Sequence, residues 1–470
     1  MKTPKYTGGA FTAARTLAPI AGPMFAELAI GIGAGLAGTW LASRVSDPAA
    51  AAFALGNHVA AMLFILFRII GAGAGVVIAQ AAGAGKLAES NAVIRANLGA
   101  STLMGLVTAL GAALGATTLM GWMNAPADIA PMAATFLFCL APSFFVDAWA
   151  ALLSSAMRAR LVNRAVLLVT TASTALQLML AAPLMLGMGA FEGWGLNGFA
   201  LAQFAGRAMA VVALLFIARN VLSLRVSGAD WIRIQPAALR PVLQIGIPGA
   251  AENIGYRLSF MASLAAAGTL GAQALATQAY ALQISYLALM FGLSIGLSME
   301  IAIGHLAGTG KLREADTLLR GALRLALILS AIATVLSALL GPCTLRGFSK
   351  DAAILREAHV LLWLTVLLEP GRTFNLVVIN ALRACGDACY PVMAGIASMV
   401  LILAGGSWLF AVVLGWGLTG IWIAYIADEW CRGMLMWMRW RSRAWAAYVQ
   451  NSRRRLSALA PDHQASSQNK

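Results

Sequence analysis

The sequence is dominated by apolar stretches that are each long enough to cross a lipid bilayer. Residues 162–188, 242–267 and 390–414 are examples, and each holds few or no charged side chains. A hydrocarbon core of about 30 Å takes roughly 20 helical residues to cross. Because lipid offers backbone amides no hydrogen-bonding partner, each crossing segment has to be helical. Counting these stretches predicts about twelve transmembrane helices.

Composition excludes a water-soluble fold. Of the 470 residues, 60% are apolar and only 11% are charged, whereas soluble domains carry about 25% charged residues. Lys2 and Lys5 precede a segment, 18–41, that is long enough to span, so we expect it to be an uncleaved first helix. The five cysteines form no CxxC pair, so neither a disulfide framework nor a zinc site is expected.

Basic residues are distributed unevenly between alternate connections. With the N-terminus inside, the outer segments hold only Arg44, Arg346, Lys350 and Arg356, while most other lysines and arginines fall in inner segments. This is the positive-inside bias, and an even number of spans returns the C-terminus to the same side. The net charge of +15 therefore reflects topology, with added attraction to anionic lipid, and predicts no nucleic-acid partner. We expect a bacterial inner-membrane location with both termini cytoplasmic.

The chain repeats itself at an offset of 225 residues, and repeats have to be found before a fold is assigned. The offset matches prolines, acids, arginines and a glycine turn in the two halves. The matched positions are Gly22-Pro23 with Ile247-Pro248, Glu27 with Glu252, 82–89 with 307–314, Arg95 with Arg320 and Arg158 with Arg383. After a three-residue change of offset, 193–198 also matches 415–420.

Two equivalent halves predict an all-α integral membrane protein with two six-helix bundles. The expected division is 1–218 for the N-terminal bundle, 219–240 for a cytoplasmic linker, 241–445 for the C-terminal bundle and 446–470 for a basic cytoplasmic tail. An even number of spans per half gives both halves one orientation, so their pseudo-twofold axis follows the membrane normal, as in some secondary transporters. A complete pathway between the halves favours a monomer.

Glu27 and Glu252 each stand four residues after a proline, in equivalent predicted helices. A charge at the bilayer centre costs roughly 2.5–3.5 kcal/mol on insertion scales, so an intramembrane acid is a candidate functional group. Either acid would be able to take up a proton or a cation. The alternative is a permanent ion pair that pins helices, for example between Glu252 and Arg257, about one turn further on.

A second polar group recurs at helical spacing in Glu369-Pro370-Gly371-Arg372-x-x-Asn375, which predicts one polar cluster on one helix face. The repeat places Asp147 opposite Arg372, which predicts a carboxylate facing a guanidinium across the axis, for coupling or for structural locking. Near the inner end of the last helix, Asp428, Glu429 and Arg432 are expected to reach the interface and to be structural.

Several other motifs have simpler interpretations. Gly83-Ala84-Gly85-Lys86 lacks the first glycine and the Ser/Thr of a phosphate-binding loop, so it is interpreted as a turn between helices. His58 and His305 are interpreted as hydrogen-bonded scaffolding rather than proton relays. With neither an HExxH motif nor a nucleophile–base arrangement, the sequence predicts no enzyme activity and no cofactor, and uphill transport would depend on an ion gradient.

The two halves, the GAGK and GTGK turns, and the segment 381–391 (ALRACGDACYP) together resemble the multidrug and toxic compound extrusion (MATE) family. The segments 247–252 with Arg257, and 369–375, resemble one bacterial branch of it. The resemblance implies a V-shaped, twelve-helix antiporter that exchanges H⁺ or Na⁺ for small organic, often cationic, compounds by alternating access. It also implies that acids in the first, seventh and tenth helices carry ion coupling.

This sequence departs from that pattern at all three acids. Gly38 and Thr39 stand where the first-helix acid is usual, and Tyr256 and Arg372 stand at the other two positions. We therefore hypothesise that coupling has moved to Glu252 and Glu369. The alternative is a flippase for lipids or lipid-linked oligosaccharides, which needs a cationic lumen that Arg68, Arg257 and Arg372 would supply.

Overall fold

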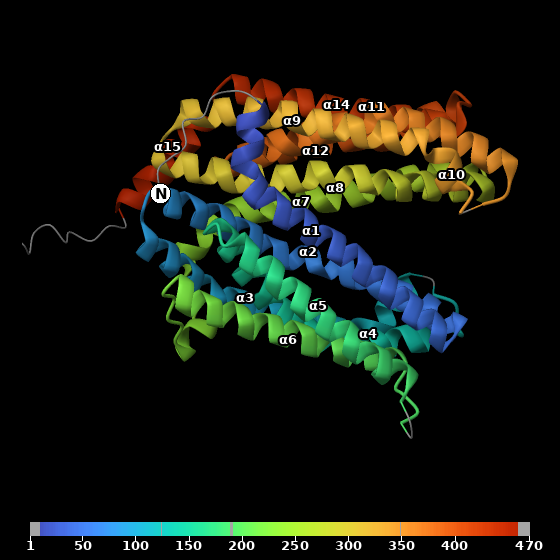
Figure 1. Cartoon of the computed structure of the whole chain (residues 1–470), viewed down its shortest axis with the longest axis horizontal. Helices are drawn as coiled ribbons and strands as arrows, with labels where there is room; N and C mark the ends of the chain where they lie inside the picture. Colours follow the sequence, from blue (N-terminus) through green and yellow to red (C-terminus); the bar gives the residue numbers. More distant parts are fainter. Residues whose placement is uncertain (1–9, 124, 189–190, 348, 459–470) are drawn as a thin grey trace, which may run out of the picture. The chain divides into compact units, whose positions relative to one another are not determined.

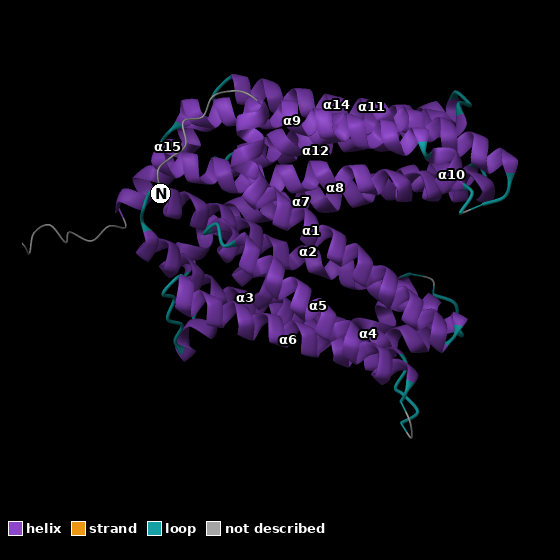
Figure 2. Cartoon of the chain, in the orientation of Figure 1, coloured by secondary structure: helices purple, strands orange, loops and turns teal. Residues whose placement is uncertain are grey.

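The computed structural model describes residues 10–123, 125–188, 191–347 and 349–458. Helices connected by short turns make up these residues, and an isolated bridge between Met188 and Phe191 is the one β-type pairing among them (Figure 2). The predicted all-α fold is confirmed.

The first half of the described chain contains six long helices and a short 3₁₀ turn. They are α1 (Ala10–Val45), α2 (Asp47–Gly83), α3 (Leu87–Trp122), α4 (Ala130–Ala159), α5 (Asn163–Leu186), α6 (Leu196–Val221) and η1 (Gly228–Trp231).

The second half repeats the pattern with more interruptions. Its elements are α7 (Pro236–Thr269), α8 (Ala272–Thr309), α9 (Leu312–Leu339), α10 (Gly341–Leu345), α11 (Ala352–Ala384), α12 (Cys389–Ser398), η2 (Met399–Ala404), α13 (Gly405–Trp408), η3 (Leu409–Val413), α14 (Gly417–Arg441) and α15 (Trp445–Ala458). The run from α12 to η3 is one helical stretch with two π-helical turns.

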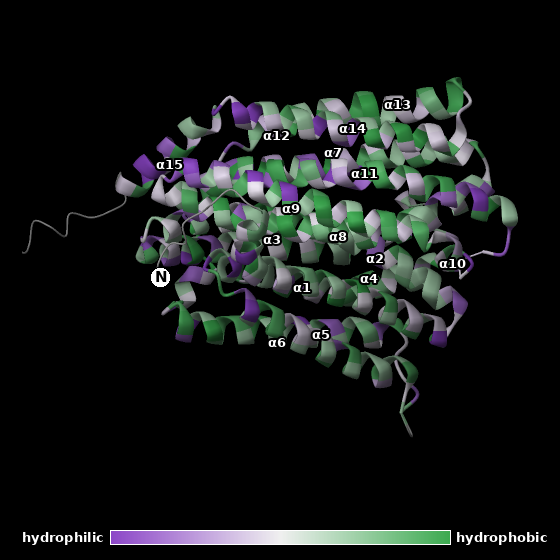
Figure 3. Ribbon diagram, turned by 45° about the horizontal axis from the view of Figure 1, so that its top comes forward, coloured by the Kyte–Doolittle hydropathy of each residue, from purple (hydrophilic) through white to green (hydrophobic). Residues whose placement is uncertain are grey.

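Nine helical stretches of the described chain are long and apolar enough to cross a membrane. Three more, α7, α11 and α14, are 34, 33 and 25 residues long but are less apolar. Each of the three carries charged side chains well inside its length, and Figure 3 shows hydrophilic residues interrupting the apolar ones there. The predicted number of spans is therefore reached only when the helices with internal charges are counted.

Two compact units divide the chain. One consists of residues 26–82 and 86–250, and the other of 1–25, 83–85 and 251–470. The cuts in α1 and α7 follow Phe25 and Ala250, two residues after Pro23 and Pro248. Proline removes one backbone hydrogen bond of the helix, which makes these points the natural places for α1 and α7 to change units. The predicted linker bounds, 219 and 240, stay a prediction.

The unit containing residues 26–82 and 86–250 is packed around aromatic rings from α2, α4 and α6. The ring of Phe53 lies 4.8 Å from that of Phe199 and 5.5 Å from that of Phe136. A Cβ atom at Gly56 would stand 2.5 Å from the Phe136 ring, so only glycine allows this approach of α2 to α4.

The unit containing 251–470 is centred on α11, which packs against α8, α9 and α14 (Figure 1). The helix α15 belongs to the same core, because Trp445 and Val449 are buried in it beside Trp440. The segment that the sequence indicated only as a basic tail thus contains a packed helix, up to the last described residue, 458.

The repeated glycine turns have the same geometry. Gly85 and Gly310, 225 residues apart, both have a φ of +77°, the left-handed region that glycine adopts without strain. Each lies between two long helices, α2 and α3 or α8 and α9. The interpretation of these motifs as turns is confirmed.

Candidate functional site

The two glutamates that follow the repeated prolines are both ion-paired, and their partners are equivalent. Arg158 Nη2 donates a hydrogen bond to Glu27 Oε2, and Arg383 Nη2 donates one to Glu252 Oε2. Each pair lies within one compact unit. The repeat relates Arg158 to Arg383 and Glu27 to Glu252, so the same contact has formed twice. The pairing of Glu252 with Arg257, left open by the sequence, is not the one observed.

These two pairs join the middle of one helix to the end of another. Arg158 lies in the last turn of α4, and Arg383 in the last turn of α11. A guanidinium near a helix C-terminus also interacts favourably with the carbonyl end of the helix dipole. Glu27 and Glu252 therefore tie α1 to α4 and α7 to α11.

A larger polar network joins α11 to α14. Arg372 Nη1 donates to Glu369 Oε1 at 2.7 Å, and Arg372 Nε donates to Glu429 Oε1 at 3.0 Å. Asn375 Nδ2 donates to the other oxygen of Glu429, at 3.0 Å. The cluster predicted from the spacing of 369, 372 and 375 is present, and Glu429 of α14 completes it.

Close approach of the two helices makes this network possible. A Cβ atom at Gly371 would lie 2.6 Å from Trp430 Nε1, so α11 and α14 meet where one side chain is missing. Trp430 Nε1 in turn donates to the carbonyl of Leu367, at 2.9 Å. The proline at 370 and the glycine at 371 thus bring residues of α14 against the charged face of α11.

The remaining charges of α14 extend the network. Arg432 Nη2 lies 2.7 Å from Asp428 Oδ2 and 2.9 Å from Glu429 Oε1. Asp428 also accepts a hydrogen bond from Ser398 Oγ at 2.6 Å. Asp428, Glu429 and Arg432 are at most 4% exposed. The expectation that they reach the membrane interface is wrong, because they point into the bundle, where they neutralise one another and Arg372.

The network carries one more carboxylate than guanidinium. Glu369, Asp428 and Glu429 face Arg372 and Arg432, which leaves one negative charge without a counter-charge. Glu369 is 0% exposed, and its Oε2 atom has no hydrogen-bond partner among the described residues. A buried carboxylate oxygen without a donor is unfavourable unless a proton or a cation occupies it. Glu369 is therefore where this cluster can take up a positive charge.

A narrow crevice adjoins this network. Tyr256 of α7 and Tyr425 of α14 line it together with Arg372, Asp428 and Glu429. Tyr256 and Arg372 stand at two positions where the family resemblance implies acids. In this structure, two carboxylates from α14 lie beside them. The sequence analysis named Asp428 and Glu429 but assigned them a structural role, because helix periodicity does not show which side chains of α11 they meet.

The equivalent place in the other unit holds a single pair of opposite polarity. Asp147 Oδ1 lies 3.1 Å from Arg207 Nε, an ion pair whose geometry does not form a hydrogen bond. Asp147 matches Arg372 at the offset of 225, and Arg207 matches Glu429 at 222, the offset of the late segments. The acid and the base have exchanged helices between the halves. Within its own unit Asp147 pairs with Arg207, and Arg372 pairs with Glu369 and Glu429, so the facing of Asp147 and Arg372 across the axis stays a prediction.

Where the structure describes them, the remaining residues singled out in the sequence take no part in these ion pairs. Arg257 is exposed and has no ion pair among the described residues, while the side chain of Arg68 lies outside the described part. His58 Nδ1 lies 3.2 Å from the carbonyl of Ala54, one turn earlier in its own helix, as expected of scaffolding. Among the described residues, no three His, Cys, Asp or Glu side chains are arranged to hold a metal ion.

Comparison with known proteins shows which family and which proteins the chain is similar to. The MatE family model matches residues 23–182 and again 248–408, two stretches that begin 225 residues apart. The chain is 31% identical over 423 residues to the uncharacterized transporter YisQ of Bacillus subtilis (strain 168), covering 90% of this chain and 93% of that protein. It is 25% identical to the probable multidrug resistance protein NorM of Rhizobium meliloti (strain 1021), covering 87% and 88%.

Solved structures share the fold. The crystal structure of MATE in the straight conformation superimposes with a TM-score of 0.84 at 17% identity, covering 96% of this chain and all of that one. The double match of the family model also confirms the internal repeat inferred from the sequence.

Proposed function

Because the chain belongs to the multidrug and toxic compound extrusion (MATE) family of membrane transporters, we propose that it exports small organic compounds, many of them cationic, in exchange for H⁺ or Na⁺. The protein is a multi-pass membrane protein of a transporter family. The ion coupling and the class of substrate are the proposal. The observation that carries it is the surplus buried carboxylate of the network between α11 and α14, with the unpartnered Oε2 atom of Glu369.

The electrostatics of the network support uptake of a single positive charge. With Glu369 ionised, two guanidiniums compensate three carboxylates. A proton or Na⁺ at Glu369 would neutralise the cluster and would weaken the hold of Glu369 on Arg372. Arg372 would then pair more fully with Glu429. If α11 and α14 change their charge pairing in this way, the ion binds one conformation more tightly than the other. Alternating access requires such a difference in affinity.

The geometry favours Glu369 over Glu252 as the ion-carrying group. Glu252 is held by Arg383 and is 12% exposed, whereas Glu369 is fully enclosed and has an unpartnered oxygen. We assign Glu252 and Glu27 to the two equivalent ion pairs that join α7 to α11 and α1 to α4. Arg372, Asn375 and Asp147 hold the charged groups in place, and neither a cofactor nor a resident metal takes part in the proposed cycle.

The test uses purified protein in liposomes loaded with a panel of fluorescent organic cations. A proton gradient and a sodium gradient are imposed separately, and dye efflux is followed. Glu369→Gln, which mimics the protonated side chain, is expected to abolish efflux under the gradient that drives the wild type. Glu89→Gln is the matched control, because Glu89 lies outside the network, in a partly exposed pair with Lys86 in the first turn of α3. Unchanged gradient-driven efflux by Glu369→Gln would contradict the assignment.

One observation keeps the flippase alternative. Arg257 is exposed on α7 without an ion pair among the described residues, as a cationic lumen would need. Arg372, in contrast, lies between two carboxylates and does not act as a free cation. Lipid translocation that occurs without either gradient and is lost in Arg257→Gln would favour the flippase. Gradient-dependent efflux that survives this substitution would favour antiport.

The proposed orientation places both termini in the cytoplasm of a bacterial cell and the protein, as a monomer, in the inner membrane. The uneven distribution of basic residues supports this orientation. Cys343 and Cys389 are exposed and belong to connections expected on opposite sides. Single-cysteine variants labelled from outside with a membrane-impermeant reagent are expected to react at Cys343 and not at Cys389.

A further inference from the structure

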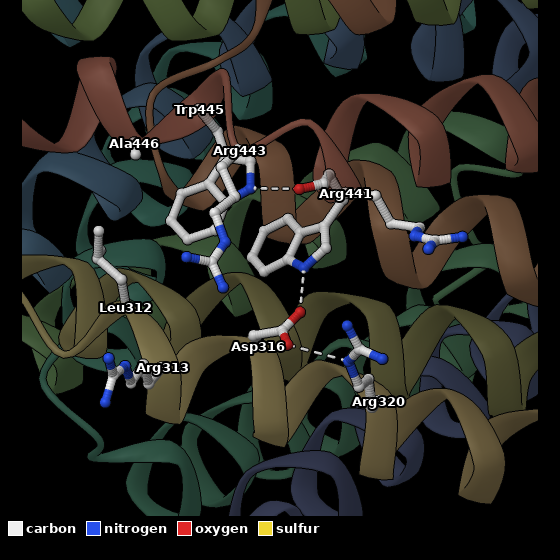
Figure 4. A pocket seen from close by; sticks show the side chains of 9 residues that line it. Leu312, Arg313, Asp316, Arg320, Arg441, Arg443, Trp445 and Ala446 are labelled. Atoms are coloured by element: carbon white, nitrogen blue, oxygen red, sulfur yellow. Dashed lines mark hydrogen bonds and ion pairs between the residues drawn. The ribbon is translucent and has the colours of Figure 1, made fainter.

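A basic cavity of about 260 Å³ lies where α9 begins and where α14 turns into α15 (Figure 4). All of its lining belongs to the unit that contains residues 251–470. The charged side chains around it are Arg313, Asp316 and Arg320 of α9, Arg441 at the end of α14, and Arg443 in the turn that follows. None of these residues takes part in the network of α11 and α14.

Most of the positive charge in this cavity is unpaired. Arg320 Nε binds Asp316 Oδ2 at 2.9 Å. Arg313, Arg441 and Arg443 have no ion-pair partner among the described residues. Four guanidiniums against one carboxylate leave three positive charges around the space. Like charges gathered in this way repel one another unless an anion lies between them. Guanidiniums are also the groups best suited to bind phosphate oxygens with paired hydrogen bonds.

Stacked, buried tryptophans form one wall of the cavity. Trp440 and Trp445 stack with their ring centroids 4.3 Å apart, and both are almost fully buried. Trp440 Nε1 donates to Asp316 Oδ1 at 2.9 Å, and Trp445 Nε1 donates to the carbonyl of Trp440 at the same distance. Asp316 is thereby held between an indole and a guanidinium. The arginines are mounted on elements whose relative positions are set by these buried contacts.

The turn between α14 and α15 is strained at an arginine. Arg443 has a φ of +57°, in the left-handed region that residues with a Cβ atom seldom adopt. Backbone strain of this kind tends to occur at functional sites. Here it turns the chain so that α15 packs back on the bundle through Trp445 while Arg443 lines the cavity (Figure 4).

The position of the cavity identifies the kind of anion. It lies directly at the end of the long helix α14, whose last turn carries Arg439 and Arg441, and basic residues at the end of a membrane helix are typical of the level of lipid head groups. Arg453 and Arg454 extend the basic surface along α15. The volume is below the roughly 300–1,000 Å³ of pockets for drug-sized ligands, so it suits a head group rather than a whole organic substrate. Basic clusters beside membrane helices attract anionic lipids.

We propose that this cavity binds the phosphate-bearing head group of an anionic membrane lipid. Arg313, Arg441 and Arg443 contact the phosphate oxygens, and the pair of Asp316 with Arg320 holds the wall in place. A bound head group fixes α15 against α9 and α14. This role is separate from transport and does not depend on the ion-coupling proposal.

The experiment measures thermal unfolding and lipid binding of the full-length protein in detergent. The additions are phosphatidylglycerol, phosphatidylcholine, inorganic phosphate and ATP. Phosphatidylglycerol alone is expected to raise the melting temperature. In Arg441→Gln/Arg443→Gln, its apparent affinity is expected to fall at least tenfold for each charge-assisted contact removed. Arg219→Gln/Arg225→Gln removes two exposed arginines near the end of α6 and is the matched control, expected to bind as the wild type does.

The outcomes separate the possible ligands. A melting temperature without lipid that equals the wild type shows that the variant is folded, and Arg313→Gln on α9 provides a second, single substitution at the cavity. An equal lipid effect in wild type and in both cavity variants would overturn the proposal. So would stabilisation by inorganic phosphate or ATP that matches the effect of phosphatidylglycerol, because the ligand would then be a soluble anion.

Discussion

At the scale of single residues, the function turns on which charges lack compensation. Glu27 and Glu252 are acids after a proline, and each has found an arginine of its own. Glu369 Oε2 and Glu27 Oε1 both lack a hydrogen-bond partner among the described residues, but Glu369 also has to share Arg372 with Glu429. Burial alone does not distinguish these acids. The ratio of carboxylates to guanidiniums within contact distance does, because a buried surplus charge is the one that gains most from binding a proton or a cation.

This ratio predicts opposite effects on stability for the two members of one ion pair. Arg372→Gln would leave Glu369 and Glu429 with too few cations and is expected to cost about 3–5 kcal/mol. Glu369→Gln removes the surplus charge, and its amide oxygen can still accept from Arg372. It is expected to leave stability unchanged or increased. Thermal unfolding of both variants in detergent checks this, and an equal loss in the two would contradict the charge count.

At the scale of helices, the same tie has formed twice. Glu27 joins α1 to the end of α4, and Glu252 joins α7 to the end of α11, with 131 residues between the partners in both cases. The prolines just before these acids mark the places where α1 and α7 pass from one compact unit to the other. The two ion pairs thus anchor α1 and α7 directly after the proline, where one backbone hydrogen bond of the helix is missing.

If Glu252 and Arg383 interact directly, a double-mutant cycle should show a coupling free energy between them. Combining Glu252→Gln with Arg383→Gln is expected to be less destabilising than the sum of the single substitutions, with a coupling of about 0.5–3 kcal/mol. Combining Glu252→Gln with Arg439→Gln is the control. Arg439 pairs with Asp387 instead, so these two effects should add. Additive behaviour in the first cycle would show that Glu252 and Arg383 do not stabilise each other.

At the scale of the whole molecule, duplication has been followed by divergence in charge. One half presents Asp147 with Arg207, and the other presents Arg372 with Glu429 at the equivalent positions. The second half then adds Glu369, Asp428 and Arg432 around its pair. The helical framework is repeated, but most of the charged side chains of these networks lie in the second half.

The exchange of acid and base between the halves can be tested by swapping the charges of Asp147 and Arg207. Asp147→Arg alone would bury a guanidinium beside the partly exposed one of Arg207, and we expect it to reduce stability and folded yield strongly. Asp147→Arg/Arg207→Glu would recreate in the first half the polarity that the second half carries at the same positions, and we expect recovery. Yield and melting temperature of the purified variants measure this. A double variant no more stable than the single one would show that the two sites are not equivalent.

The sequence alone determined the number of spans, the all-helical fold, the repeat and the glycine turns. These depend on properties that are local to the chain: the length of apolar runs, the spacing of residues on one helix and the conformational freedom of glycine. It also named the acids and bases of the network between α11 and α14, but assigned neither Arg207 nor the arginines of the basic cavity to a site. Hydropathy was weakest for α7, α11 and α14, where internal charges lower the apolar signal.

Only the tertiary structure decided which charge faces which. Glu252 meets Arg383 rather than Arg257, and Glu429 meets Arg372 rather than the interface, because helix packing brings together residues 131 and 57 positions apart. The orphan oxygen of Glu369, the reversed pair in the other unit and the basic cavity beside α15 have the same origin. Lipid compels a chain of this composition to form helices, but the pairing of buried charges depends on which faces those helices present to one another.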